Sequence, residues 1–313
     1  MHQPTYQKNH LATDAFSYGG RIVCGTSGLG GVWGEINPDE SVAAILYALT
    51  HGVRAFDTAP SYANAERYLG MALAEWHGEK PFISTKVGRQ RGEDAFDFKL
   101  DYTNAALEKS LHQSLKTLGV EMIDLLFLHE PQLAPVEEMD RIITCLHRFK
   151  EQGLIRYVGV GGNPNATFYP FIKKKNFDVV SGFLKLDACN LSALEKDIPL
   201  FQSEHIAYYA ASPLHFALLG ERLEAYKKSG ADDTWITKKD ITNALEVEKL
   251  AASVGMPIST VAQRYLFAIT EADRIVVGPK NLEQMKATLD DWEAGALPVS
   301  LFNAVTHIIL KKP

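Results

Sequence analysis

The chain has 313 residues, of which 46% are hydrophobic and 22% charged, an ordinary composition for a globular protein with enough apolar material for a core. Its formal net charge of −6 argues against a nucleic acid or an anionic membrane surface as its main partner. The three cysteines lie far apart without metal-ligand spacing, so we expect a reducing, cytoplasmic location and no metal site.

We interpret residues 1–17 as a polar leader and residues 18–313 as one catalytic domain. In that domain, eight short apolar runs alternate with longer segments of helical periodicity. The expected strands span 21–24, 53–56, 81–86, 122–128, 156–160, 178–183, 207–211 and 274–277. The helices expected after them span 40–52, 65–76, 104–119, 135–153, 167–175, 198–204, 241–255 and 281–292.

The strand candidates are unbroken apolar runs, as expected for a parallel sheet that is covered on both faces. Eight such pairs predict an α/β protein of the (β/α)8 TIM barrel type. The alternative, a doubly wound open sheet, would carry the phosphate-binding pattern G-x-G-x-x-G, but the glycines of residues 25–34 have the wrong spacing. The connection over residues 214–240 is unusually long and contains a helical piece, so we expect a lid or binding element there.

In such a barrel the residues that follow the strands share one rim, where the chemistry takes place. An acid, a phenol, an amine and an imidazole follow three consecutive strands: Asp57, Tyr62, Lys86 and His129. A nearby ammonium from Lys86 would lower the pKa of Tyr62, and Asp57 would keep Lys86 charged and oriented. A neutral His129 could orient a carbonyl or an alcohol. This set transfers protons without a nucleophile, which suits hydride transfer with a cofactor.

Each of the four has another explanation when taken alone. Asp57 could only cap the following helix, and Tyr62 could be an ordinary, partly buried aromatic residue. Lys86 could be a solvated charge and His129 a satisfied loop histidine. Their coincidence at consecutive strand ends favours the catalytic interpretation.

The chain resembles the aldo-keto reductase superfamily through short segments that follow the family's order along nearly its whole length. They are Gly25-Thr26, FDTAPSY (56–62), STKVG (84–88), LFLH (126–129), YVGVGG (157–162), ASPL (211–214) and VVGPKNLEQM (276–285). The resemblance implies that the same four rim residues carry the reaction, with NAD or NADP extended across the rim and no Rossmann domain. The cofactor contacts that it implies are Gly25, Thr26, Ser212, Leu214, Gly278, Lys280 and Gln284.

Some positions depart from the family. Ala211 stands where many members stack a tyrosine on the nicotinamide, and Gly161-Gly162 replaces a Ser-Asn pair. The asparagine of this pair has its counterpart one position later, at Asn163, and we still place Gly162 and Asn163 among the cofactor contacts.

At the adenosine end, Gln284 stands where NADP-preferring members commonly have arginine, and Thr288 where they have asparagine. Lys280 could still pair with a 2′-phosphate as a point charge. Because a neutral amide cannot offer the charged fork that such a phosphate favours, we expect NAD rather than NADP, with dual use open.

Within the superfamily the motifs are most similar to the aldose 1-dehydrogenase branch, which includes L-galactose, L-fucose and D-arabinose dehydrogenases. This resemblance implies oxidation of the anomeric hydroxyl of an aldose to a lactone, with Tyr62 accepting the proton. Ala63 and Ala65 differ from the Gly and Ser usual in that branch. Trp33 is expected either to form a substrate wall or to fill core space.

Two alternatives stay open: an NADPH-dependent reductase of aldehydes or ketones, and a nucleotide-binding regulatory subunit with little turnover. For both the dehydrogenase and the reductase, the expected partner is a small-molecule substrate, either a sugar or a carbonyl compound.

Overall fold

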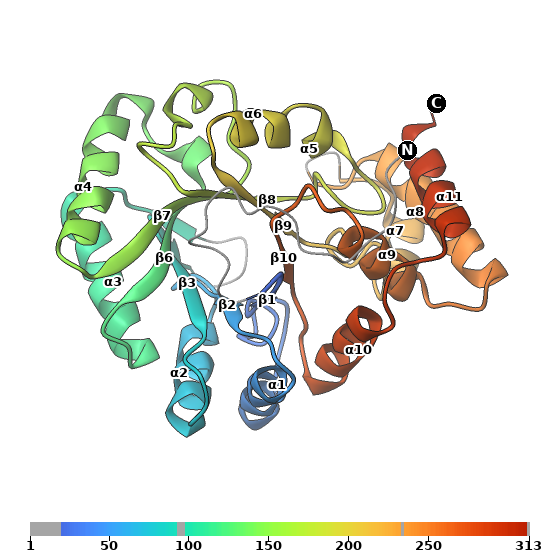
Figure 1. Ribbon diagram of the computed structural model, residues 1–313, viewed down its shortest axis with the longest axis horizontal. Coiled ribbons are helices and arrows are strands. Elements are labelled where there is room, and N and C mark those ends of the chain that lie inside the picture. The colour runs from blue at the N-terminus through green and yellow to red at the C-terminus, as the bar shows by residue number, and fades with distance from the viewer. Residues whose placement is uncertain (1–19, 93–97, 233–234, 312–313) are drawn as a thin grey trace.

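A closed barrel of eight parallel strands forms the centre of the molecule, which confirms the predicted (β/α)8 TIM barrel (Figure 1). The computed structural model describes residues 20–92, 98–232 and 235–311, so the leader predicted for residues 1–17 lies outside the described residues. Around the barrel the strands follow the order β1-β10-β9-β8-β7-β6-β3-β2. Their bounds are β1 Ile22–Gly25, β2 Ala55–Asp57, β3 Phe82–Val87, β6 Ile123–His129, β7 Ile155–Gly161, β8 Val179–Phe183, β9 Ala207–Ala211 and β10 Arg274–Val277.

Helices surround the barrel and cover the outer faces of its strands (Figure 1). The helices are α1 Pro38–Thr50, α2 Ala65–Glu75, α3 Asn104–Leu118, α4 Met139–Glu151, α5 Ser192–Glu195, α6 Asp197–Ser203, α7 Leu223–Ser229, α8 Lys238–Ser253, α9 Ile258–Phe267, α10 Leu282–Glu293 and α11 Val299–Leu310. Local sequence explains where several begin. The Asn37 side chain accepts hydrogen bonds at the start of α1, and Thr237 forms a capping box with Asp240 at the start of α8. Among the described residues no helix is long and apolar enough to cross a membrane.

The helix predicted for residues 167–175 is wrong. The structure has only a 3-10 turn at Tyr169–Phe171 in this segment. Pro170 lacks a backbone N–H and disfavours the helical conformation of the residue before it, so an α-helix cannot run through this point. Further elements were not predicted: the antiparallel pair of β4 Arg89–Arg91 and β5 Phe98–Leu100, and the helices α5, α9 and α11.

The barrel interior is filled by large side chains that point inward from alternating strand positions. Phe127 contacts Tyr209 edge-on, with ring centroids 6.2 Å apart, and Phe82 belongs to the same buried cluster. Gly159 on β7 leaves room for this packing, because a Cβ there would lie 2.6 Å from Cδ1 of Phe127. The interior is therefore a packed core, and any ligand site must lie at its open end.

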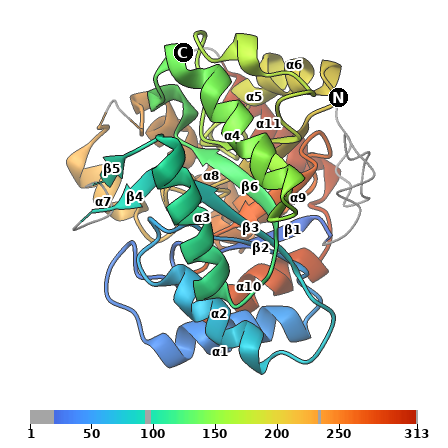
Figure 2. The ribbon, with the colours of Figure 1, turned by 90° about the vertical axis from the view of Figure 1, so that its left-hand side faces the viewer.

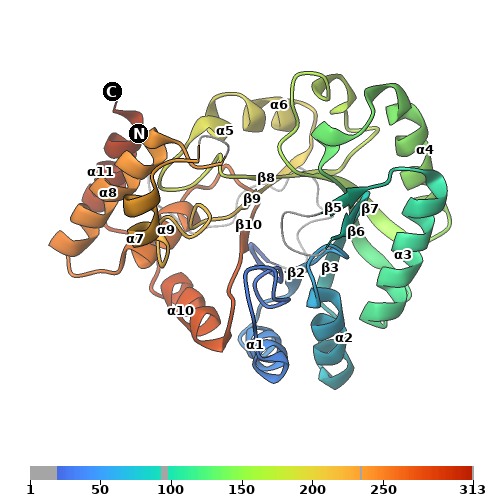
Figure 3. The same ribbon diagram turned by 180° about the vertical axis from the view of Figure 1, so that it is seen from behind.

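The connections that follow the carboxyl ends of the strands build one end of the barrel. Figure 2 shows β4, β5 and α7 at the same end of the molecule. The predicted helical piece in the long connection after β9 is α7, which lies beside α8 (Figure 3).

Candidate active site

A buried ion pair between two neighbouring strands forms the base of the site. Lys86 in β3 places its Nζ 2.5 Å from Oδ2 of Asp57, which ends β2, and it also donates to the carbonyl oxygen of Thr58 at 2.8 Å. Ser84 donates to the other carboxylate oxygen of Asp57 at 2.9 Å. Since both charged side chains are buried, these hydrogen bonds supply the compensation that water would otherwise give.

Tyr62 and His129 complete the group of four side chains that the sequence predicted. The Lys86 ammonium lies 4.6 Å from the centroid of the Tyr62 ring. His129, the last residue of β6, faces the same ring edge-on, with centroids 5.8 Å apart and an interplanar angle of 87°. Gly30 makes room for the connection that carries Tyr62, since a Cβ on Gly30 would lie 2.3 Å from the carbonyl oxygen of Tyr62. The structure thus brings Asp57, Tyr62, Lys86 and His129 to one place.

The protonation states follow from burial and from the ion pair. Burial raises the pKa of Tyr62 above its usual value of about 10, although Lys86 acts to lower it. The expectation that Lys86 would give a net decrease is therefore wrong, because desolvation outweighs the ammonium. Burial lowers the pKa of Lys86, but Asp57 and Tyr62 more than offset this, so its pKa is raised and the amine stays charged.

His129 is neutral. Burial lowers its pKa well below 6.5, and the positive charges of Lys86 and Arg89 lower it further. Within the described part of the chain its buried Nδ1 has no hydrogen-bond partner. At neutral pH the site therefore presents a phenol, an ammonium and a neutral imidazole, which are two proton donors and one group that can orient an oxygen.

The residues predicted to contact a cofactor lie at the ends of β1, β7, β9 and β10, or just beyond them. They are Gly25, Thr26, Gly162, Asn163, Ser212, Leu214, Gly278, Lys280 and Gln284. Thr26 is fully buried and donates its hydroxyl to the carbonyl oxygen of Asp57 at 3.0 Å, so this hydroxyl braces β2. Gly278 is exposed and no atom lies within 4 Å of where a Cβ would be, which leaves the rim open there.

Asn163 uses both polar atoms of its amide within the protein. It donates to the carbonyl oxygen of Phe183 at 2.9 Å and accepts from the backbone N–H of Phe183 at 3.1 Å. The preceding Gly162 has φ +146° and donates to the carbonyl oxygen of Ser181 at 3.0 Å. These bonds tie the β7 connection to β8, and a contact of Asn163 with a cofactor stays a prediction.

An acidic residue that the sequence analysis missed occupies the predicted adenosine end. Glu221, in the connection between β9 and α7, forms an ion pair with Lys280. Gln284 accepts a hydrogen bond from the backbone N–H of Lys280 at 2.9 Å, and its Nε2 lies 3.5 Å from Oε2 of Glu221. Lys280 and Trp33 also line a cavity of about 410 Å³ between the connections after β1 and β10.

Trp33, in the connection after β1, belongs to a cluster of aromatic side chains that also come from the end of β8 and from the segment between β9 and α8. Its ring centroid lies 6.1 Å from that of Phe216, which in turn lies 5.9 Å from Phe183 and 6.0 Å from Trp235. Trp33 is 46% exposed and Trp235 is 40% exposed. Trp33 therefore does not fill the core, which favours its predicted place in a wall open to solvent.

The buried ion pair yields a test by stability. Asp57→Ala leaves the Lys86 ammonium buried without its partner, so we expect the free energy of unfolding to fall by about 3–5 kcal/mol. Glu246→Ala removes an exposed i,i+3 pair with Lys249 and should change little. Urea unfolding followed by circular dichroism measures both; an Asp57→Ala protein as stable as the control contradicts the account of the ion pair.

Comparison with known proteins agrees with this architecture. The chain matches the model of the Aldo/keto reductase family over residues 21–309. It is 26% identical over 271 residues to the L-galactose dehydrogenase of Arabidopsis thaliana, covering 84% of this chain and 81% of that one. It is 24% identical over 308 residues to the NADH-specific methylglyoxal reductase of Escherichia coli, covering 91% of both.

Among solved structures, a glycerol dehydrogenase from Gluconobacter oxydans matches with a TM-score of 0.74 at 24% identity, over 94% of this chain and 93% of that chain. The fold is thus shared with a solved relative, and the family model spans nearly all of the described barrel. The chain belongs to the Aldo/keto reductase family of oxidoreductases.

Proposed function

We propose that the protein is an NAD-dependent dehydrogenase that oxidises the anomeric hydroxyl of an aldose to a lactone. The observation that carries this proposal is the convergence of the Lys86 ammonium, the Tyr62 phenol and the neutral His129 imidazole above a packed barrel. The similarity to an enzyme named L-galactose dehydrogenase supports the sugar substrate.

A cavity at the rim supports the binding of a dinucleotide. The cavity of about 410 Å³ is lined by Gly28, Trp33, Lys280 and Asn281, among others, so it joins the predicted substrate wall to the predicted adenosine end. Gly28 lets the connections after β1 and β10 approach each other closely at the edge of this cavity, because a Cβ there would lie 2.5 Å from the carbonyl oxygen of Pro279. When bound, the nicotinamide would accept a hydride from the anomeric carbon.

The protein's own residues manage the proton. Neutral His129 donates its N–H to the sugar oxygen and so leaves the hydroxyl proton directed toward Tyr62. For oxidation, Tyr62 must first lose its proton, and Lys86 stabilises the resulting phenolate. The phenolate then takes the proton from the oxygen of the anomeric hydroxyl while a hydride leaves the anomeric carbon. The carbon–oxygen bond becomes the carbonyl of the lactone, and the loss of H⁺ and H⁻ together leaves the sugar uncharged.

One observation favours a second candidate, the reduction of aldehydes or ketones at neutral pH. Burial raises the pKa of Tyr62, so at pH 7 the phenol is protonated and ready to donate to a carbonyl oxygen. The relative named NADH-specific methylglyoxal reductase, which matches 91% of the chain, supports this direction. The two candidates share one site and differ in substrate and pH.

The preference for NAD rests on Glu221. Its carboxylate already pairs with Lys280, the one predicted adenosine-end residue with a positive charge. A 2′-phosphate placed there would have to compete with this carboxylate and be repelled by it, whereas the ribose hydroxyls of NAD could donate hydrogen bonds to it. The similarity to an enzyme named NADH-specific methylglyoxal reductase agrees with this assignment.

Tyr62→Phe tests the proton donor or acceptor. The substitution removes only the hydroxyl, so we expect turnover to fall by roughly 10²–10⁴-fold with nucleotide affinity unchanged. Tyr47→Phe, on α1, is the matched control and should retain full turnover. Turnover is measured from the absorbance of the reduced nicotinamide, with each of a panel of aldoses and aldehydes assayed in the presence of NAD(H) and of NADP(H). Near-normal turnover of Tyr62→Phe overturns the assigned role.

The pH dependence tests the raised pKa of Tyr62. Because the phenolate is the base, the rate of oxidation should rise through the alkaline range toward a pKa above the usual value of about 10. The rate of reduction should stay constant from neutral to mildly alkaline pH, since the phenol is already protonated there. An oxidation rate that reaches its plateau at pH 7 would contradict the burial of this group.

Glu221→Gln tests cofactor choice. Loss of the carboxylate frees Lys280, so we expect kcat/KM with NADP to improve roughly fivefold while that with NAD falls. Glu224→Gln, three residues away on α7 and paired with Lys227, is the control and should leave the ratio of the two cofactors unchanged. Initial rates at constant ionic strength measure the ratio; an identical ratio in Glu221→Gln and wild type places the adenosine pocket elsewhere.

A further inference from the structure

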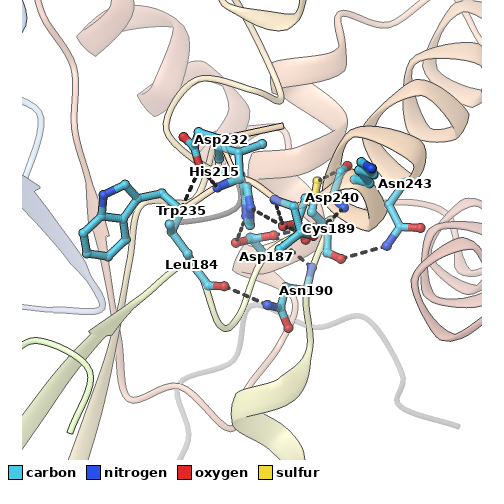
Figure 4. A network of polar contacts seen from close by, with 12 residues as sticks. Leu184, Asp187, Cys189, Asn190, His215, Asp232, Trp235, Asp240 and Asn243 are labelled. Carbon is cyan, nitrogen blue, oxygen red and sulfur yellow. Dashed lines mark hydrogen bonds and ion pairs between the residues drawn. The ribbon is translucent and has the colours of Figure 1, made fainter. Parts of the chain in front are cut away.

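The connection that follows β9 carries a buried histidine, which lies between two carboxylates from other segments (Figure 4). His215 places Nδ1 2.7 Å from Oδ2 of Asp187 and Nε2 3.6 Å from Oδ2 of Asp240. Its side chain is 1% exposed, and that of Asp187 is fully buried. Asp187 follows β8 and Asp240 lies in the first turn of α8, so one imidazole joins three segments that are distant in the chain.

Each carboxylate is itself held in place by other groups. Asp187 accepts the backbone N–H groups of Cys189 at 2.7 Å and Asn190 at 3.1 Å through its Oδ1. Asp240 accepts from Thr237 in the capping box that begins α8. Both carboxylates are therefore held in place by other groups, and His215 attaches the connection after β9 to them.

The segment that carries His215 has a backbone conformation that non-glycine residues rarely adopt. Ser212 has φ +62°, and the consecutive residues His215, Phe216 and Ala217 have φ values of +50°, +51° and +63°. None is a glycine, so the surrounding contacts must impose this path. His215 supplies an ionic contact of this kind, and Phe216 adds ring contacts to Trp33, Phe183 and Trp235.

The same segment carries groups from both ends of the proposed cofactor site. Ser212 and Leu214 are predicted contacts, and Glu221, six residues after His215, reaches Lys280. Backbone hydrogen bonds make the segment compact: Leu219 N donates to Leu214 O at 3.1 Å and Arg222 N donates to Ala217 O at 3.0 Å. A displacement at His215 would thus shift the groups on either side of it.

We propose that His215, as an imidazolium held between Asp187 and Asp240, is a positioning residue that fixes the segment of residues 212–221 in its cofactor-binding conformation. The proposal rests on the proposed function only for its last step, the binding of a nicotinamide dinucleotide. The imidazolium and its two carboxylates are a separate claim about this protein, testable without any nucleotide.

The charge state agrees with the geometry. Burial alone would lower the pKa of His215, but Asp187 and then Asp240 raise it to about 10. Burial alone would raise the pKa of Asp240, but the hydrogen bonds from Thr237 and the charge of His215 lower it. The His215 contact is an ion pair, since Nε2 lies 3.6 Å from Oδ2 of Asp240 and makes no hydrogen bond to a described residue. The other titratable groups nearby, Cys189 and the more distant Tyr208 and Tyr265, have pKa values raised by burial and are neutral at neutral pH.

A metal ion is the competing occupant of this cluster. Ligand atoms of Asp187, Cys189 and His215 all lie within 4.8 Å of one another. However, both ring nitrogens of His215 already face carboxylates, and burial together with the two aspartates raises the pKa of the Cys189 thiol well above its usual value. A thiol is a poor metal ligand compared with a thiolate, so the cluster fits a proton on His215 better than a metal ion.

The decisive variant is His215→Asn, because asparagine tolerates a positive φ but cannot carry the charge. The control is His205→Asn, at an exposed histidine with φ +56°, far from any predicted contact. We expect His215→Asn to raise the Kd for NAD roughly tenfold, as if the binding conformation were populated about a tenth of the time, with kcat at saturating NAD changed much less. His205→Asn should bind as the wild type does.

Hydrogen exchange of the free protein separates local loosening from general instability. The amides of residues 212–221 should exchange faster in His215→Asn, while those of β3 and β6 keep their wild-type protection. Unchanged exchange in residues 212–221 together with an unchanged Kd overturns the proposal. If even the wild type fails to bind NAD or NADP by calorimetry, the proposed function fails, and the exchange result still decides whether His215 fixes the segment.

Nuclear magnetic resonance of histidine-labelled protein tests the imidazolium directly and does not depend on the variant folding. In the wild type the ring of His215 should carry both protons at pH 8, where an ordinary histidine is neutral. Because the pKa is raised, the charged form is present at lower pH and lost as the pH rises through about 10. Asp240→Asn should move this titration to lower pH. A ring of His215 that is neutral at pH 7 overturns the proposal. So does a purified wild-type protein that contains one equivalent of zinc, if His215→Asn no longer contains it.

Discussion

The pair of Asp57 and Lys86 is the interaction on which the site depends. It lies between adjacent strands, where the barrel register places Asp57 beside Ser84, two residues before Lys86. Such a pair is stable in a dry environment only when its remaining hydrogen-bonding capacity is used, and Ser84 and Thr58 use it. The fixed ammonium then sets the electrostatics of its neighbours: it opposes the effect of burial on Tyr62 and helps to keep His129 neutral.

The barrel and its rim are built by different physical means. The strands are held by register and by tightly packed aromatic rings, and three of the four candidate catalytic residues, Asp57, Lys86 and His129, lie at or near their carboxyl ends. The connection after β9 has left-handed residues that cost on the order of 1–3 kcal/mol each, so it depends on contacts from outside itself. Buried charge on His215 and the aromatic cluster around Phe216 supply those contacts. The candidate catalytic residues are thus placed mainly by strands, whereas the proposed cofactor contacts of residues 212–221 belong to a segment whose conformation is imposed by its surroundings.

The strands and the four rim residues were predictable because they depend on local patterns. Unbroken apolar runs revealed all eight barrel strands, and their carboxyl ends necessarily share one rim. Features that depend on long-range contacts were not predictable. Glu221 lies 59 residues from Lys280, and Asp187 lies 28 residues from His215, with no spacing signal to join them. The net pKa of Tyr62 was misjudged for the same reason, since the nearby charge was visible in the sequence but the depth of burial was not.

The proposed reaction requires a nicotinamide ring to reach the point where Tyr62, Lys86 and His129 meet. A crystal structure of the protein grown with NAD is the decisive measurement. We expect the nicotinamide ring within the rim, leaving room for one sugar carbon between its C4 and the Tyr62 hydroxyl, with the adenosine beside Glu221 and Lys280. A nucleotide bound with its nicotinamide away from Tyr62 would contradict it.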